Sequence, residues 1–195
     1  MTEFAPRLGD ALIIVDVQND FLPGGNLAVR DGDAVIAPIN RCAALFAAGG
    51  HPVFATRDWH PKDHCSFTTR GGSWPPHCVA HSRGAEFPAV LGMPESATVI
   101  SKASGADSDA YSGFDGTGLA QLLRARQVRR VFVAGLATDY CVLATVKDAL
   151  AQGFEAVVIA DAVRAVNAAP DDGERALGEM RALGAKLAAL KDVAA

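Results

Sequence analysis

Three side chains of different chemistry could together form a nucleophilic site. Cys141 follows the apolar run 131–134 after one tight turn, and Asp16 and Lys102 each follow another short apolar run. A carboxylate near a thiol can accept its proton and later pass it to a leaving amine, and a nearby ammonium favours the ionised states of both. Taken singly, each residue has an ordinary alternative: an inert buried thiol, a capping aspartate and a solvated lysine.

Cys141 falls in the first turn of a predicted helix, which continues through Leu143, Val146 and Leu150 and ends near Gly153. A thiol in that turn faces unpaired backbone N–H groups and the positive end of the helix dipole. Both features favour thiolate over thiol, so we expect a low pKa for Cys141.

A second group of residues could bind a metal ion. Asp58 and His60 stand two positions apart at a predicted strand end, where extended chain points both side chains the same way. With His77 from the following loop they offer one carboxylate and two imidazoles, a ligand set with open coordination positions that suits a catalytic or substrate-binding metal. A solvated loop with surface histidines is an equally good interpretation. Further ligand candidates, ranked lower, are His64, His81, Cys65 and Cys78.

The elements that must position these side chains alternate between strands and helices. Strands are predicted at 12–18, 52–56, 98–101, 131–134, 155–160 and 185–190, and helices at 33–48, 118–127, about 139–153 and 170–183. This alternation predicts an α/β fold of three layers, α/β/α, with a central, mainly parallel six-stranded sheet. Ligand sites of such sheets lie at the carboxyl ends of the strands, where the winding reverses. Four of these ends present the polar side chains Asp16, Asp58, Lys102 and Cys141.

Two long segments without periodicity separate these elements. The first, 61–94, is rich in Gly, Pro, Ser and His, and the second, 103–116, carries Tyr111 and Phe114. Loops of this length in a compact domain are either disordered or functional, and the aromatic and histidine content of the first favours function.

Composition restricts the classes of protein that fit. The chain has 195 residues, of which 50% are hydrophobic, so we expect a single domain over residues 1–195. A net charge of −4, with no basic run longer than Arg129-Arg130, argues against nucleic acid or an anionic membrane as a partner. No apolar run reaches membrane-spanning length and no export signal stands at the N-terminus. The four cysteines lack C-x-x-C spacing, which favours a reducing cytoplasm.

Five short motifs contain the residues discussed above. They are Asp16-Val-Gln-Asn-Asp20-Phe21, Thr-Arg-Asp58-Trp-His60-Pro, Trp74-Pro-x-His77-Cys, Lys102 with Tyr111-Ser-Gly-Phe114, and Gly135-Leu-Ala-Thr-Asp-Tyr-Cys141-Val. Together they resemble one known family, the nicotinamidase branch of the isochorismatase-like cysteine hydrolases. The resemblance extends from about Leu12 to Asp161, with the motifs in the family's order.

The resemblance implies a role for each group of residues. It implies a catalytic triad, a set of ligands for one divalent metal ion, an oxyanion hole and three aromatic pocket walls. The triad would be Asp16, Lys102 and Cys141, and the metal ligands would be Asp58, His60 and His77. The oxyanion hole would consist of the N–H groups of Ala137, which follows a cis peptide, and of Cys141. The pocket walls would be Phe21, Trp74 and Tyr111. His64 is a further candidate that would act on the metal through water. Carboxylate and imidazole ligands suit zinc, iron and manganese alike, and zinc is the first expectation.

The implied activity is the deamidation of nicotinamide to nicotinate and ammonia through a thioester, in NAD salvage, with pyrazinamide also accepted. A relative acting on another amide, such as an N-carbamoyl compound, is the nearest alternative, and an isochorismatase fits less well. A metal-dependent binding module without turnover is a different class. A dinucleotide-binding dehydrogenase would need a G-x-G-x-x-G motif after the first strand, where Asp16-Val-Gln-Asn stands instead. Assembly as a homo-oligomer stays open.

Overall fold

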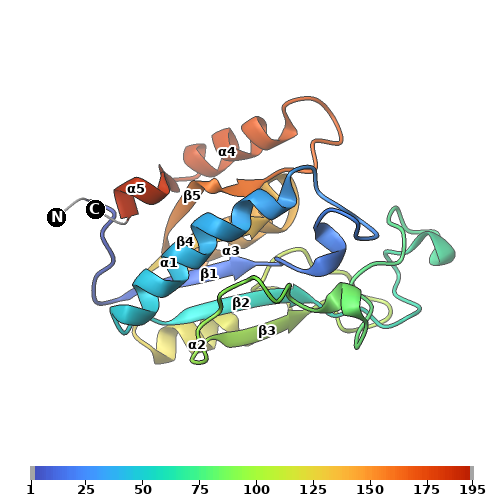
Figure 1. The fold of residues 1–195 in the computed structure, drawn as a ribbon, viewed down its shortest axis with the longest axis horizontal. Helices are drawn as coiled ribbons and strands as arrows, with labels where there is room; N and C mark the ends of the chain where they lie inside the picture. The colour runs from blue at the N-terminus through green and yellow to red at the C-terminus, as the bar shows by residue number, and fades with distance from the viewer. Residues whose placement is uncertain (1–2, 194–195) are drawn as a thin grey trace.

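Six strands form one sheet through the centre of the protein (Figure 1). The structure is a computed structural model and describes residues 3–193. The strands are β1 (Asp10–Val15), β2 (Val53–Asp58), β3 (Thr98–Lys102), β4 (Arg130–Leu136), β5 (Glu155–Arg164) and β6 (Lys186–Ala188). Their order is β3-β2-β1-β4-β5-β6, and every neighbouring pair is parallel. The predicted α/β architecture is confirmed.

Helices cover both faces of the sheet. They are α1 (Ile36–Ala48), α2 (Leu119–Ala125), α3 (Leu143–Ala151), α4 (Asp172–Ala182) and α5 (Leu190–Val193). Leu12 and Ile14 of β1 pack into the core on the side of α1, whereas Ile13 and Val15 face the opposite core, which includes residues of α2, α3 and α4. In Figure 1, α1 crosses the front of the sheet and α2 and α3 lie behind it. Because side chains alternate along a strand, a strand buried on both faces reads as an unbroken apolar run.

The winding of the sheet reverses between β1 and β4. From β1 the chain adds β2 and then β3 on one side, and it returns to place β4 on the other side of β1. The register pairs Val15 with Thr56 of β2 and with Gly135 of β4, and it pairs Asp58 with Lys102 across β2 and β3. The carboxyl ends of four strands therefore meet in one place, which is where a doubly wound sheet forms its ligand site.

Gly135 allows β1 and β4 to approach closely at this point. Its φ is +124°, a conformation that residues with a side chain rarely adopt, and a Cβ there would lie 2.1 Å from the carbonyl oxygen of Val15. Both obstacles are backbone features, so a neighbouring side chain cannot relieve them by moving.

Replacing Gly135 with alanine is therefore expected to lower the free energy of unfolding by about 3 kcal/mol or more. Chemical denaturation of both proteins measures the difference. Gly178→Ala is the matched control, because Gly178 lies inside α4 with nothing within 4 Å of the place where a methyl group would stand, and alanine there should stabilise the helix by roughly 0.5–1 kcal/mol. Equal stability of Gly135→Ala and the parent protein would contradict the close approach described here.

Several element boundaries differ from the predictions. β2 ends at Asp58 and β3 at Lys102, so both polar residues belong to the strands themselves, and β5 continues to Arg164. The short helix α5 was not predicted, since four residues are too few to show a helical period. The segment after β2 contains two short helical turns, Thr68–Arg70 and Arg83–Ala85, and the segment between β3 and α2 contains none, as predicted for long loops.

Two expectations about the class of protein can be compared with the described residues. None of the helices within residues 3–193 has the length and hydrophobicity needed to cross a membrane. All four cysteines are free thiols, which agrees with the absence of a disulfide framework.

Candidate active site

The ammonium group of Lys102 stands at the centre of the site and is fully buried. Its Nζ lies 3.0 Å from Asp16 Oδ2 and 3.6 Å from Cys141 Sγ, and it also donates to Asp58 Oδ1. A further bond of 3.1 Å goes to the carbonyl oxygen of Ala110. The lysine, itself the last residue of β3, thus contacts the polar side chains at the other three strand ends, and it brings together the three residues expected to form a catalytic triad.

The charges in this cluster favour the protonated form of Lys102 and the ionised form of Asp58. Burial opposes charge on Lys102, but Asp16 and Asp58 outweigh it and raise the lysine pKa well above its ordinary value. Burial also opposes ionisation of Asp58, but Lys102 and His60 outweigh it and hold the pKa of that carboxyl below its ordinary range.

The expected low pKa of Cys141 is wrong for the resting protein. Burial, and then the charges of Asp16 and Asp58, raise the pKa of the Cys141 thiol well above its ordinary value, although Lys102 acts in the opposite direction. The cysteine lies fourth in a π-helical turn, Thr138–Val142, and burial is the largest cause of the raised pKa. Burial raises the pKa of Asp16 as well, so the thiol and this carboxyl compete for one proton.

Asp58, His60 and His77 form a buried group whose ligand atoms lie within 4.8 Å of one another. The Nδ1 atom of His60 is 3.1 Å from the carbonyl oxygen of Ala103, and Nδ1 of His77 is 2.8 Å from that of Pro75. Because a carbonyl can only accept, each histidine holds a proton on Nδ1, so Nε2 is the nitrogen whose lone pair its neutral ring would offer to a metal. Backbone carbonyls commonly orient metal-binding histidines in this way, so these residues fit a divalent metal ion.

A second group of possible ligand atoms comprises Asp16, Asp58 and Cys141. Lys102 already contacts all three through its ammonium. Since a metal ion would have to displace that buried cation, the group does not fit a metal, and Lys102 serves as its positive charge.

His64 lies beside the candidate metal ligands without offering a free nitrogen. Its ring stacks on His60 with 4.1 Å between centroids, its Nδ1 is 2.7 Å from the Ser66 hydroxyl, and its Nε2 is 3.1 Å from the carbonyl oxygen of Ser108. Its predicted action on a metal through water stays a prediction. The lower-ranked candidates His81, Cys65 and Cys78 belong to neither group of possible ligands in residues 3–193.

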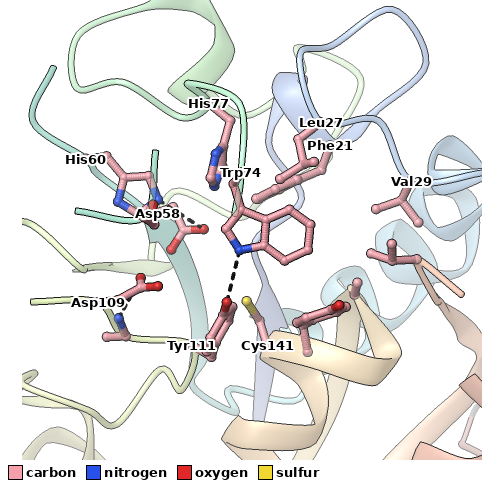
Figure 2. A pocket seen from close by; sticks show the side chains of 15 residues that line it. Phe21, Leu27, Val29, Asp58, His60, Trp74, His77, Asp109, Tyr111 and Cys141 are labelled. Carbon is pink, nitrogen blue, oxygen red and sulfur yellow. Dashed lines mark hydrogen bonds and ion pairs between the residues drawn. The ribbon is translucent and has the colours of Figure 1, made fainter. Parts of the chain in front are cut away.

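Aromatic and aliphatic side chains enclose the space in front of Cys141. Figure 2 shows Asp58, His60 and His77 on one side of this pocket and Phe21, Leu27 and Val29 on the other, with the sulfur directed between Trp74 and Tyr111. Trp74 Nε1 donates to the Tyr111 hydroxyl over 3.0 Å, which joins the two long loops. Phe114 instead packs in the core against Phe154, so Tyr111 is the aromatic residue of its loop that faces the pocket.

The peptide bond between Leu136 and Ala137 is cis, as the sequence resemblance implies. Ala137 follows the last residue of β4 and lines the pocket together with Cys141. Its carbonyl oxygen accepts the N–H groups of Tyr140 and Val142, which closes the π-helical turn that carries the nucleophile candidate.

A family model, the isochorismatase domain, matches residues 10–192 of the chain. The chain belongs to the isochorismatase family. The match includes all six strands and every residue of the site described above.

Two relatives of this isochorismatase-family chain are named nicotinamidase or nicotinamidase/pyrazinamidase. It is 39% identical to the nicotinamidase of Escherichia coli strain K12, with 93% of this chain and 95% of the relative covered. It is 45% identical to the nicotinamidase/pyrazinamidase of Mycobacterium tuberculosis H37Rv, with coverage of 91% and 97%.

Two solved structures superpose closely on this isochorismatase-family chain. The pyrazinamidase of Pyrococcus horikoshii in complex with zinc has a TM-score of 0.89 at 50% identity and covers 93% of this chain and 99% of its own. PnC1 from L. infantum in complex with nicotinate also has a TM-score of 0.89, at 39% identity, with coverage of 99% and 98%.

Gln18, for which the sequence indicated no role, holds the backbone of Asp58 in place by hydrogen bonds. Its side chain pairs with the Asp58 backbone twice, accepting the N–H and donating to the carbonyl oxygen, each over 2.8 Å. A third bond of 3.0 Å reaches the carbonyl oxygen of Ala85. Gln18 is fully buried and continues the pairing of β1 with β2 after β1 has ended. The only sequence signal was its place in the polar motif that follows the first strand.

Proposed function

We propose that this chain hydrolyses the carboxamide of nicotinamide, releasing nicotinate and ammonia, and that it also accepts pyrazinamide. The observation that carries the proposal is the contact of one buried lysine with Asp16, Asp58 and Cys141 beneath an aromatic pocket. The names of the relatives and the nicotinate-bound and zinc-bound structures support the same substrate class and a metal.

In the proposed reaction Cys141 is the nucleophile and Asp16 moves the proton. As Asp16 takes the thiol proton, the sulfur attacks the amide carbon and forms a tetrahedral intermediate. Asp16 then protonates the departing nitrogen, and ammonia leaves a thioester on Cys141. Water that gives a proton to the Asp16 carboxylate attacks the thioester, and nicotinate departs with the thiol restored. Lys102 keeps the charge of the cluster balanced throughout, since it contacts both groups.

The oxyanion of the tetrahedral intermediate would be bound by the backbone N–H groups of Ala137 and Cys141. Such donors are directed at charge that develops only as the reaction proceeds, and losing one typically costs about 10²–10³ in rate. Phe21, Trp74 and Tyr111 would hold the flat ring between them and exclude water from the reacting carbon.

A single divalent metal ion would be held by the Asp58 carboxylate and the Nε2 atoms of His60 and His77. Zinc is the first expectation, because the donor set suits it and a similar solved structure contains it. When bound, the metal supplies an electrophilic anchor for the pyridine nitrogen, which orients the carboxamide toward Cys141.

Ammonia release from nicotinamide tests the proposed function directly. Purified protein, the same protein after treatment with a chelator, and chelated protein resupplied with zinc are compared. We expect release from the first and third samples and a large loss in the second. Metal-replete protein that releases no ammonia would refute the nicotinamide assignment, and N-carbamoyl compounds would be assayed next.

Replacing His60 with alanine is expected to weaken metal binding by about a hundredfold or more, because even the loss of a hydrogen-bond partner of a ligand costs 10- to 100-fold. Metal content by mass spectrometry after dialysis against a weak chelator measures the effect. His51→Ala is the matched control, since His51 packs against Phe46 near the opposite end of the sheet. Full metal content in His60→Ala would place the metal elsewhere.

The remaining expectations form part of the proposal. We place the activity in NAD salvage in the cytoplasm, where free thiols persist. Residues 1–195 are proposed to act as one domain, with a small molecule rather than a nucleic acid or a membrane as partner.

A further inference from the structure

Val166 also lines the pocket, and it comes from the segment that follows β5. It belongs to the connection between β5 and α4, residues 165–171, and is half-buried against the core. This connection contains Asn167 and Asp171 in the left-handed region, with φ of +53° and +65°. Such a segment needs specific contacts to hold one conformation, because non-glycine residues adopt positive φ at a cost.

Asp139 provides those contacts. One oxygen of its carboxylate accepts the N–H of Val166 and the other accepts the N–H of Asn167, each over 2.9 Å. The side chain of Asn167 in turn accepts the N–H of Gly173 in the first turn of α4, over 2.8 Å. Hydrogen bonds to an ionised carboxylate are among the stronger ones in proteins. One side chain therefore fixes the backbone on which Val166 is mounted.

Asp139 also lies in the π-helical turn Thr138–Val142, two residues before Cys141. Its carboxylate consequently connects the turn that carries the nucleophile candidate to a pocket wall 27 residues further along the chain. A movement of the Val166 backbone away from this turn would break one or both of these bonds.

We propose that Asp139 is a positioning residue that sets the size of the ring the pocket accepts, through the placement of Val166. The inference rests on the proposed amidase activity. Asp139 takes no part in bond making, so removing its contacts should alter which amides bind and leave the chemical step largely intact.

Steady-state kinetics with nicotinamide and 5-methylnicotinamide test the proposal. Asp139→Asn keeps one acceptor oxygen and Asp139→Ala keeps none, so we expect KM for nicotinamide to rise about threefold and about tenfold, with kcat within about threefold of the parent. The preference for nicotinamide over the methylated ring should fall by about tenfold in Asp139→Ala. Asp148→Asn, which removes a carboxylate from the neighbouring helix α3, is the matched control. It should change neither KM for nicotinamide nor the preference for nicotinamide over the methylated ring.

A double-mutant cycle with Asp139 and Val166 distinguishes effects of Asp139 that act through Val166 from its other effects. If Asp139 acts through Val166, Val166→Ala should relax the ring preference by itself, and Asp139→Ala should add little to it. Fully additive effects would overturn the proposal. A fall in kcat at unchanged KM would also overturn it, because the carboxylate would then act on the turn that carries Cys141.

Amide hydrogen exchange keeps this result distinct from failure of the proposed function. Exchange at the Val166 and Asn167 N–H groups should be at least about tenfold faster in Asp139→Ala than in Asp148→Asn. If the parent protein released no ammonia, the nicotinamide assignment would fail and exchange would still report on the carboxylate contacts. Unchanged exchange in Asp139→Ala would overturn the positioning role whatever the substrate.

Discussion

Replacing Cys141 with alanine is expected to reduce ammonia release from nicotinamide by at least about a thousandfold. The proposed reaction passes through a thioester on this sulfur, and removing the nucleophile from a comparable hydrolytic site costs between roughly 10³ and 10⁶ in kcat. Quantifying ammonia in single-turnover and multiple-turnover assays measures the loss.

Metal content and ligand binding should survive the Cys141→Ala change. The sulfur contacts Lys102 and is absent from the group formed by Asp58 and the two histidines, so the candidate metal ligands stay in place. Calorimetric titration with nicotinamide checks this point. Cys42→Ala is the control, because it removes another buried thiol, from α1 in the core, and should keep its turnover. Near-normal release by Cys141→Ala would eliminate the thioester mechanism.

Asp16→Asn is expected to lower kcat by about 10²–10⁴, the usual contribution of a positioned acid–base group. Asparagine can still accept the 2.6 Å bond from the Thr56 hydroxyl, but its NH2 group then faces the Lys102 ammonium where Oδ2 stood. It cannot take the thiol proton or return it to the departing nitrogen. Lys102 keeps Asp58 as a counter-ion, which limits the cost in folding free energy.

The assay for Asp16→Asn should pair turnover with thermal unfolding, so that loss of fold is recognised. Thr56→Val is the companion variant, since it removes the hydroxyl that holds Asp16 but leaves the carboxylate itself. We expect it to lose much less activity than Asp16→Asn. Comparable losses in the two variants would show that position, and not proton transfer, is what Asp16 contributes.

Most of the fold could be predicted because its central strands are buried on both faces. β1 and β4 consist almost entirely of apolar residues, so their unbroken runs stand out from the alternating pattern of exposed strands. The polar residues at their ends were visible for the same reason. A parallel sheet brings such ends together, which is why Asp16, Lys102 and Cys141 could be grouped from the sequence alone.

The charge state of the site could not be predicted from the same pattern. Position at the start of a helix favours a Cys141 thiolate, but the pKa also depends on burial and on the carboxylates of Asp16 and Asp58. The degree of burial depends on how the loops pack over the sheet, and no local spacing encodes it.

Contacts between a side chain and a distant backbone were equally invisible. Gln18 reaches the backbone of Asp58, 40 residues away, and Asp139 reaches Val166, 27 residues away. Neither partner has a distinctive residue type, because any residue supplies an N–H or a carbonyl. Such roles emerge only when the fold places the two segments side by side.

The division of the site between strand ends and loops has a consequence for evolution and for engineering. Asp16, Lys102 and Cys141 are mounted on the rigid sheet or directly after it, whereas Trp74, His77 and Tyr111 come from the connecting segments. Connecting segments tolerate insertion and substitution far better than a buried sheet does. New amide specificities are therefore best sought in libraries of the two long loops that keep the candidate metal ligand His77, so that the hydrolytic centre stays unaltered while the recognised molecule changes.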